Sequence, residues 1–175
     1  MFNISELQYI TQDIQGHSHA ELAEFACKGG VDWIQVRIKD KPVQEWKQIA
    51  SEVLEVCKKY NARLIVNDNI EIAKAIGAHG VHVGLTDTPV EKAREYLGNK
   101  FIIGGTANTF EDIKKHYNAG ANYVGVGPFR FTNTKKNLSP ILGIKGYEAI
   151  TNQCKQEKVS IPVIAIGGIL CEDIE

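Results

Sequence analysis

Short apolar runs alternate with longer amphipathic stretches along the whole chain. The runs are rich in Val, Ile and Leu and end at Gly, Asn or Pro, a pattern typical of buried strands. We expect strands at Leu7–Thr11, Trp33–Arg37, Leu64–Asn67, Gly80–Val83, Phe101–Gly105, Tyr123–Gly127 and Pro162–Ile166.

The stretches between these runs have helical periodicity, clearest in Pro42–Tyr60, where apolar residues recur at helical spacing. Pro42 and Pro89 suit first-turn helix positions, and Gly77 and Gly98 stand where helices should end. We expect helices at Ala20–Lys28, Pro42–Tyr60, Ile70–Ile76, Pro89–Leu97, Phe110–Asn118 and Ile144–Lys155.

This alternation predicts a parallel sheet covered by helices. No GxGxxG motif follows the first strand, so the signature of dinucleotide-binding open sheets is missing. Polar residues such as Thr11, Asn67 and Thr106 instead follow nearly every strand. A (β/α)8 barrel draws its site from many strand ends, whereas an open sheet uses one switch point. We therefore predict a single α/β domain over residues 1–175, a TIM (β/α)8 barrel.

The predicted barrel lacks its last strand–helix unit, because the sequence offers seven strands and closure needs eight. A gap would expose unpaired backbone groups on both sides. We expect these residues to belong to a longer protein of at least about 200 residues, the lower bound of this fold. The alternative is that the chain ends at Glu175 and a partner subunit covers the gap, as in a homodimer.

Composition narrows the classes of partner. The net charge of −1 gives no reason to expect nucleic acid or an anionic membrane. No apolar run approaches the roughly 20 residues that a membrane helix needs, and the N-terminus has no signal-peptide core. The four cysteines are scattered without a CxxC pair and suggest reduced thiols. We expect a cytoplasmic protein with small-molecule ligands.

The strand beginning at Trp33 is unusually polar on one side. Strand alternation puts Gln35, Arg37 and Lys39 on one face, opposite an apolar face. Unpaired cations are costly in a half-buried place, so a polyanionic ligand is the natural partner. A half-exposed strand with two solvated basic residues remains the alternative.

Two carboxylates follow neighbouring strands. Asp68 comes directly after an apolar strand, and Asp87 comes shortly after the next one. On adjacent parallel strands they would lie at the same rim, where two hard oxygen ligands suit Mg²⁺ bridged to a substrate phosphate. Each Asp could instead be the N-cap of the helix that it precedes.

Two loops could hold phosphate. Thr132, Thr134 and Lys135 follow one strand, and Gly167-Gly168 ends the last one, where backbone N–H groups are free to bind an anion. The first stretch could also be an ordinary surface loop. His82 lies on the inward face of its strand and is interpreted as a hydrogen-bonded interior residue, with a catalytic role left open.

With these elements in order, the chain resembles the thiamine-phosphate synthase family from Tyr9 to Ile169. The motifs that carry the resemblance are Gln35-Val36-Arg37-Ile38-Lys39, Asn67-Asp68, Gly80-Val81-His82-Val83-Gly84 with Asp87, Gly127-Pro128 through Thr132-Asn133-Thr134-Lys135, and Gly167-Gly168. The family joins a hydroxymethylpyrimidine diphosphate to a thiazole phosphate and releases pyrophosphate.

The resemblance implies a role for each motif. It implies catalytic roles in leaving-group stabilisation for Arg37, Lys39 and Lys135, and Mg²⁺ binding by Asp68 and Asp87. It implies that substrates contact Gln35, Val36, Arg37, Ile38, Lys39, Asn67, Thr106, Thr132, Asn133, Thr134, Lys135 and Gly168.

The sequence also departs from the family pattern. Leu85 stands where Gln is frequent, and Gly105-Thr106-Ala107-Asn108 replaces a Ser-x-His pattern, which affects the pyrimidine pocket more than the diphosphate site. Thiazole tautomerases share the barrel, but Asn108 lacks the imidazole that proton transfer would need. A phosphate-binding degenerate barrel is the non-enzymatic alternative.

Overall fold

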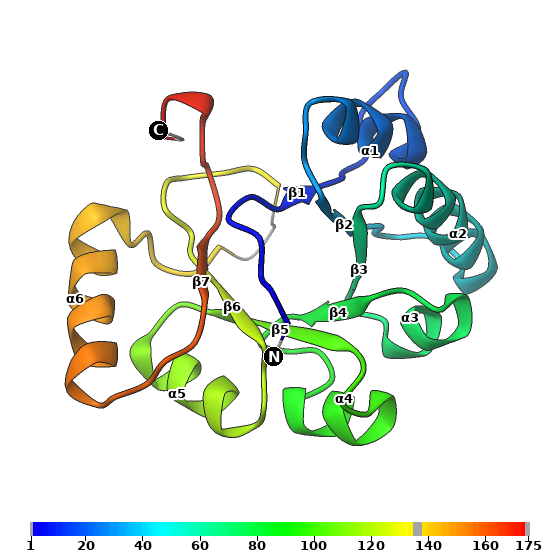
Figure 1. Cartoon of the computed structure of the whole chain (residues 1–175). Helices are drawn as coiled ribbons and strands as arrows, with labels where there is room; N and C mark the ends of the chain where they lie inside the picture. Colours follow the sequence, from blue (N-terminus) through cyan, green and yellow to red (C-terminus); the bar gives the residue numbers. More distant parts are fainter. Residues whose placement is uncertain (1, 135–137, 174–175) are drawn as a thin grey trace.

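The computed structural model describes residues 2–134 and 138–173, which form one curled parallel sheet with helices on its outer side (Figure 1). The strands pair in chain order: β1 (Tyr9–Ile10), β2 (Trp33–Val36), β3 (Arg63–Asn67), β4 (Gly80–Val83), β5 (Ile102–Ala107), β6 (Tyr123–Val126) and β7 (Val163–Ala165). The helices are α1 (His19–Lys28), α2 (Val43–Lys59), α3 (Ile70–Ile76), α4 (Val90–Leu97), α5 (Phe110–Asn118) and α6 (Gly143–Gln156), and a 3₁₀ turn, η1, covers Cys171–Asp173.

The order of elements is as predicted, and the differences lie at their ends. Pro42 and Pro89 are N-caps rather than first-turn residues, since each carbonyl accepts the first intrahelical hydrogen bond. Strand β1 is shorter than predicted. Strand β5 is longer and includes Thr106, because Thr106 pairs with Gly125 of β6.

The sheet is a curled half-barrel of seven parallel strands, which confirms the α/β class. In the described part of the chain, β1 and β7 do not pair with each other, so the closed barrel of the prediction is not seen. The N-terminal segment crosses the opening (Figure 1). Phe2 and Ile4 of this segment pack on the inner core, and Arg63 donates to the Asn3 carbonyl and the Ser5 hydroxyl.

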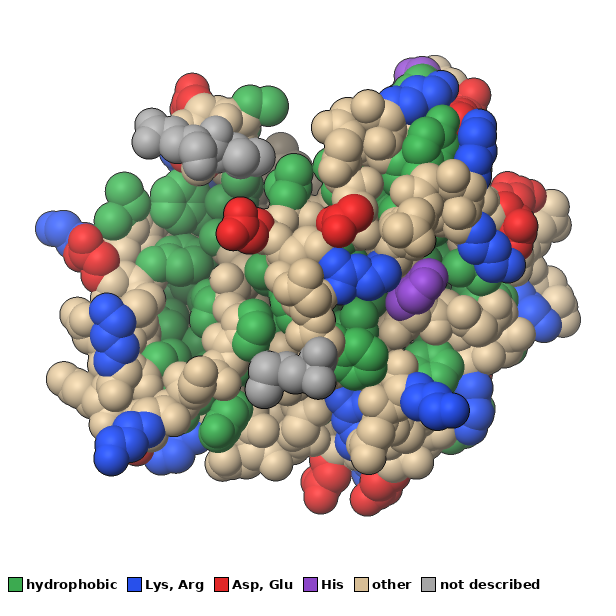
Figure 2. Space-filling view, in the orientation of Figure 1, with side chains coloured by type: hydrophobic (Ala, Val, Ile, Leu, Met, Phe, Trp, Pro, Cys, Tyr) green, Lys and Arg blue, Asp and Glu red, His purple; other side chains and the backbone are tan. Residues whose placement is uncertain are grey.

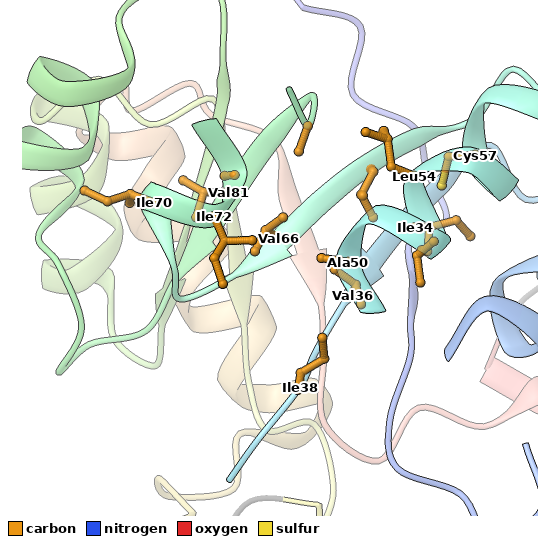
Figure 3. Packing of buried hydrophobic residues seen from close by; sticks show 14 of the residues in the cluster. Ile34, Val36, Ile38, Ala50, Leu54, Cys57, Val66, Ile70, Ile72 and Val81 are labelled. Atoms are coloured by element: carbon orange, nitrogen blue, oxygen red, sulfur yellow. The ribbon is translucent and has the colours of Figure 1, made fainter. Parts of the chain in front are cut away.

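The main hydrophobic core lies between the sheet and its helices (Figure 3). The apolar face of β2 contributes Ile34 and Val36, which are fully buried and pack with Ala50 and Leu54 of α2. Ile38, just past the strand, extends the same face. Each such side chain contributes about 1.5–3 kcal/mol of hydrophobic stabilisation. The alternation predicted for β2 is therefore confirmed on its outer side.

A second cluster fills the inside of the curl. Trp33, Ile65, Ile102 and Tyr123 are nearly or wholly buried there. The rings of Trp33 and Tyr123 meet edge to face, with centroids 4.8 Å apart. Gly104 makes this possible, because a Cβ at that position would lie 2.2 Å from Cζ of Tyr123.

The outer face of β7 is less covered than the other strands. Val163 is exposed, and hydrophobic side chains gather on the surface over α6 and β7 (Figure 2). A groove of about 620 Å³ runs between these elements, lined in part by Tyr147, Ala165 and Ile169. Among residues 2–134 and 138–173, every helix is too short or too polar to cross a membrane.

We expect Gly104→Ala to lower the free energy of unfolding by about 1–3 kcal/mol, because the new methyl group overlaps the Tyr123 ring. Urea denaturation measures this change. Gly29→Ala is the control, since its new Cβ would lie 3.3 Å from the nearest atom, the Ala26 carbonyl oxygen. An equal loss in both variants would contradict the packing argument.

Candidate active site

Charged side chains from neighbouring strands meet at the carboxyl end of the sheet. Arg37 and Lys39 follow β2, Asp68 follows β3, and Asp87 lies in the loop after β4. The Lys39 ammonium binds the Asp68 carboxylate, whose side chain is only 16% exposed. Lys39 is therefore ion-paired, although its side chain is 44% exposed.

Asp68 and Asp87 lie close enough to affect each other's charge. Burial and the neighbouring Asp68 carboxyl both raise the pKa of Asp87. Asp87 Oδ2 also accepts a hydrogen bond of 2.8 Å from the Gly84 N–H. The Asp68 backbone has a φ of 63°, and its N–H donates to the His82 carbonyl at 2.8 Å. Two strand ends thus hold the carboxylates in place.

Neither carboxylate caps a helix. The N-cap of α3 is Asn69, whose side chain accepts from the Ile72 N–H at 2.8 Å. The N-cap of α4 is Pro89, which provides no side-chain cap. The N-cap alternative for Asp68 and Asp87 is therefore wrong, and helix capping does not account for either carboxylate.

The pair fits a hard divalent cation. Two adjacent carboxylates with one neighbouring cation, Lys39, gain from added positive charge. Within the described residues no group of three or more His, Cys, Asp or Glu side chains gathers as a metal cage. Mg²⁺ is commonly held by one or two carboxylates, with waters and substrate phosphates completing its shell. Asp68 and Asp87 are the residues that would hold it.

Arg37 connects β2 to the loop after β6. Its Nη2 donates to the Thr134 carbonyl at 3.1 Å, and the Thr132 and Thr134 hydroxyls lie 3.0 Å apart. The two threonines, with Asn133 between them in the sequence, therefore lie beside the cationic strand end. Lys135 lies outside the described residues.

The backbone of Arg37 is fixed by a buried relay that the sequence analysis missed. The Arg37 N–H donates to Thr11 Oγ1 at 3.3 Å, and this hydroxyl lies 2.7 Å from His19 Nδ1. The other ring nitrogen of His19 lies 3.3 Å from Asp13 Oδ1. Since Thr11 is fully buried, this Asp–His–Thr arrangement positions the strand end rather than meeting a substrate.

The loop after β6 is held at both ends. Asn108 donates through Nδ2 to the carbonyls of Gly127 and Pro140, both at 2.9 Å. Arg130 forms a two-pronged ion pair with Asp173 and donates to the Gly168 carbonyl at 3.2 Å. The Arg130 partner lowers the pKa of Asp173 to about 2. Arg130 thus joins this loop to the backbone of Gly168.

The remaining predicted contacts lie deeper. Gln35 and Asn67 are 2% and 7% exposed, and Thr106 lies half-buried in β5. Val36 and Ile38 bury their side chains on the helix side of the sheet, so only their backbone atoms are available to a ligand.

His82 is buried and hydrogen bonded, as predicted, with Tyr123 Oη at 3.0 Å and Thr106 Oγ1 at 2.9 Å. Sequence analysis missed Tyr123 as a polar interior residue. Its signal was Gly104 on the neighbouring strand β5, where a Cβ would overlap the Tyr123 ring.

Comparisons with known proteins agree with this geometry. A family model described as thiamine monophosphate synthase matches residues 7–175. The chain is 51% identical over 168 residues to a thiamine-phosphate synthase of Bacteroides thetaiotaomicron, covering 96% of this chain and 80% of that protein. It is 52% identical over 169 residues to one of Phocaeicola vulgatus, covering 97% and 81%.

A solved structure is similar as well. The thiamine phosphate pyrophosphorylase of Pyrococcus furiosus superposes with a TM-score of 0.81 at 31% identity. The match covers 96% of this chain and 78% of that one. The similarity therefore extends over nearly the whole chain in both sequence and backbone.

We expect Asp87→Asn to resist urea better than the wild type at pH 7 without divalent ions. The folded-state pKa of Asp87 lies above its ordinary value of 3.8, so ionising this carboxyl costs folding free energy once the pH exceeds that value. Asn can still accept from the Gly84 N–H but carries no charge.

Urea midpoints measured over a range of pH test this expectation, and the gain should shrink as the pH falls toward 3.8. Asp32→Asn is the control, because the Asp32 side chain is 60% exposed and its ion-pair partner is Arg63. A gain that does not change with pH would contradict the charge argument.

Proposed function

The chain belongs to the thiamine monophosphate synthase family, and on that premise we propose that it joins hydroxymethylpyrimidine diphosphate to a thiazole phosphate with release of pyrophosphate. It is an enzyme of the transferase class in thiamine biosynthesis. The observation that carries the proposal is the Arg37–Thr134 contact, because it joins the cationic strand end to the threonine loop.

The chemistry needs charge stabilisation more than a general base. The C–O bond to the diphosphate breaks, and the leaving pyrophosphate takes the electron pair. The thiazole nitrogen then uses its lone pair to form the new C–N bond, and no proton has to move. Arg37 and Lys39, with Lys135, stabilise the charge that develops on the leaving oxygens.

The diphosphate binds at the carboxyl ends of β2 to β4 in this proposal. Gln35 and Asn67 contact the pyrimidine diphosphate from inside the curl, and the backbone at Val36 and Ile38 lies along it. Asp68 and Asp87 would hold Mg²⁺, which would supply positive charge to the two phosphates. Lys39 keeps Asp68 oriented toward the same place.

The thiazole phosphate binds across the other half of the site. Thr132, Asn133 and Thr134 supply hydroxyl and amide groups, and Gly168 supplies a backbone N–H. Arg130 supports both the threonine loop and Gly168, because it lies in the loop after β6 and donates to the Gly168 carbonyl. The two substrates would then meet beside Thr106, in the middle of the curl.

The rival thiazole tautomerase activity finds less support. Asn108 stands where a proton-transferring imidazole would be wanted, and its amide is already committed to two backbone carbonyls. A degenerate phosphate-binding barrel would bind both substrates without joining them. Turnover of the two purified substrates separates these cases from the synthase.

The same premise supports the finer architectural predictions. We propose a closed TIM barrel, one domain and a cytoplasmic location as well, and the match to the pyrophosphorylase over 96% of this chain supports the barrel. A homodimer stays a prediction that sedimentation would test.

We expect Arg37→Ala and Lys39→Ala to lower kcat by about 10²–10³-fold, which corresponds to about 2.7–4 kcal/mol of transition-state stabilisation. Steady-state kinetics with both substrates measure the loss. Lys41→Ala is the matched control, because Lys41 lies on the same segment and pairs with Glu45 outside the site. A change in KM alone would show that the cations bind substrate without favouring bond cleavage.

We expect the reaction to require Mg²⁺ or Mn²⁺ and Asp68→Asn to lose nearly all coupling activity. The cation should also raise the melting temperature of the wild type but not of Asp68→Asn, because binding stabilises the folded state. Glu71→Gln removes an exposed carboxylate of α3 and should behave as the wild type. Full wild-type activity in excess EDTA would contradict the metal requirement.

A further inference from the structure

A continuous line of side-chain hydrogen bonds crosses the inside of the curled sheet. Gln35 Nε2 donates to Gln8 Oε1 at 2.9 Å, and Gln8 Nε2 donates to Tyr123 Oη at 3.3 Å. Tyr123 Oη lies 3.0 Å from His82 Nδ1, and His82 Nε2 lies 2.9 Å from Thr106 Oγ1. The line links β2, the N-terminal segment, β6, β4 and β5.

The donor at the start favours one direction for the bonds that follow. Tyr123 accepts from Gln8 and has a single proton, which it can donate only once. In the tautomer in which Tyr123 donates this proton to His82 Nδ1, the ring carries its own proton on Nε2 and donates it to Thr106. Burial raises the pKa of the Tyr123 hydroxyl, which keeps it a neutral donor.

Thr106 is the last residue of this hydrogen-bond chain, and its hydroxyl proton is not used within the chain. Because Thr106 Oγ1 accepts from His82, its hydroxyl proton is left to point at another acceptor. Thr106 is half-buried, whereas His82 and Tyr123 are 5% and 0% exposed. The line therefore begins at one proposed substrate contact, Gln35, and finishes at another.

We propose that Tyr123 and His82 are positioning residues that hold the Thr106 hydroxyl as a hydrogen-bond donor to an acceptor atom of the bound pyrimidine diphosphate. This proposal rests on the proposed function, and it gives Thr106 a fixed polarity that the residue type alone does not. Thr can donate or accept, and the relay leaves it only the role of donor toward the substrate.

Glycines in β5 and β6 leave space for the Tyr123 and His82 rings. A Cβ on Gly104 would lie 2.5 Å from Tyr123 Oη, and a Cβ on Gly125 would lie 3.0 Å from His82 Cε1. Gly104 is the register partner of His82, and Gly125 is the partner of Thr106. The glycines therefore stand beside the relay itself, and a larger residue at either would displace it.

The His82 tautomer is the first test and is independent of activity. Nitrogen-15 NMR of histidine-labelled protein should show His82 protonated on Nε2 in the wild type. Tyr123→Phe removes the donor to Nδ1, and the ring should then populate both tautomers. A wild-type ring protonated on Nδ1 would overturn the proposal, because Thr106 would then be the donor to His82.

The second test is a double-variant cycle. Tyr123→Phe should lower kcat/KM for the pyrimidine diphosphate about tenfold, the usual size of one hydrogen-bond loss, with little change in KM for the thiazole phosphate. Thr106→Val should lower it at least as much, and Thr106→Ser should restore it. The Tyr123→Phe/Thr106→Val double variant should be no worse than Thr106→Val alone, because Tyr123 acts through Thr106.

Tyr60→Phe is the control, since it removes a tyrosine hydroxyl that binds Glu24 on the outer side of the fold. Circular dichroism and urea denaturation check that each variant is folded. If the kcat/KM losses of the two single variants multiply in the double variant, the relay is overturned and Tyr123 has a merely structural role. An inactive wild type would instead overturn the proposed function, and the two failures are therefore distinct.

Discussion

The narrow interior of the curled sheet is the constraint on which the rest of the structure depends. Polar groups that point into it lose water, and hydrogen bonds to partners on the other strands offset that loss. Tyr123 and His82 satisfy each other there, and glycines on the neighbouring strands give their rings space. Because the partners come from β4 and β6, the interior contacts also set how those strands lie relative to each other.

The same register determines the site at the rim. Asn67 of β3 pairs with His82 of β4, and Val36 of β2 pairs with Val66 of β3. Residues a few positions beyond these pairs lie at the same level above the carboxyl end of the sheet. This brings Lys39, Asp68 and the loop of Asp87 together. The charge cluster is thus a consequence of parallel pairing, together with the left-handed backbone of Asp68, which has a φ of 63°.

The sequence predicted those features of the fold whose signal lies in residues close together along the chain. Hydrophobic periodicity predicted the order of strands and helices, and strand alternation predicted the two faces of β2. The sequence was insufficient for Asp68 and Asp87, since an Asp before a helix has the same local pattern as a cap and as a ligand. Only the observed caps, Asn69 for α3 and Pro89 for α4, distinguish the two cases. The Tyr123 relay was not predictable, because it joins residues that are 115 positions apart at its widest step.

Gly168 couples the conformation of the loop after β7 to that of the loop after β6. It adopts a φ of 75°, and a Cβ there would lie 2.9 Å from the Arg130 Cβ and 3.1 Å from two carbonyls of the loop after β6. A side chain at 168 would therefore push the threonine loop away from Arg37, whatever chemistry it added. Any reshaping of this half of the pocket for a larger ligand has to begin at Arg130, and Gly168 has to stay as it is.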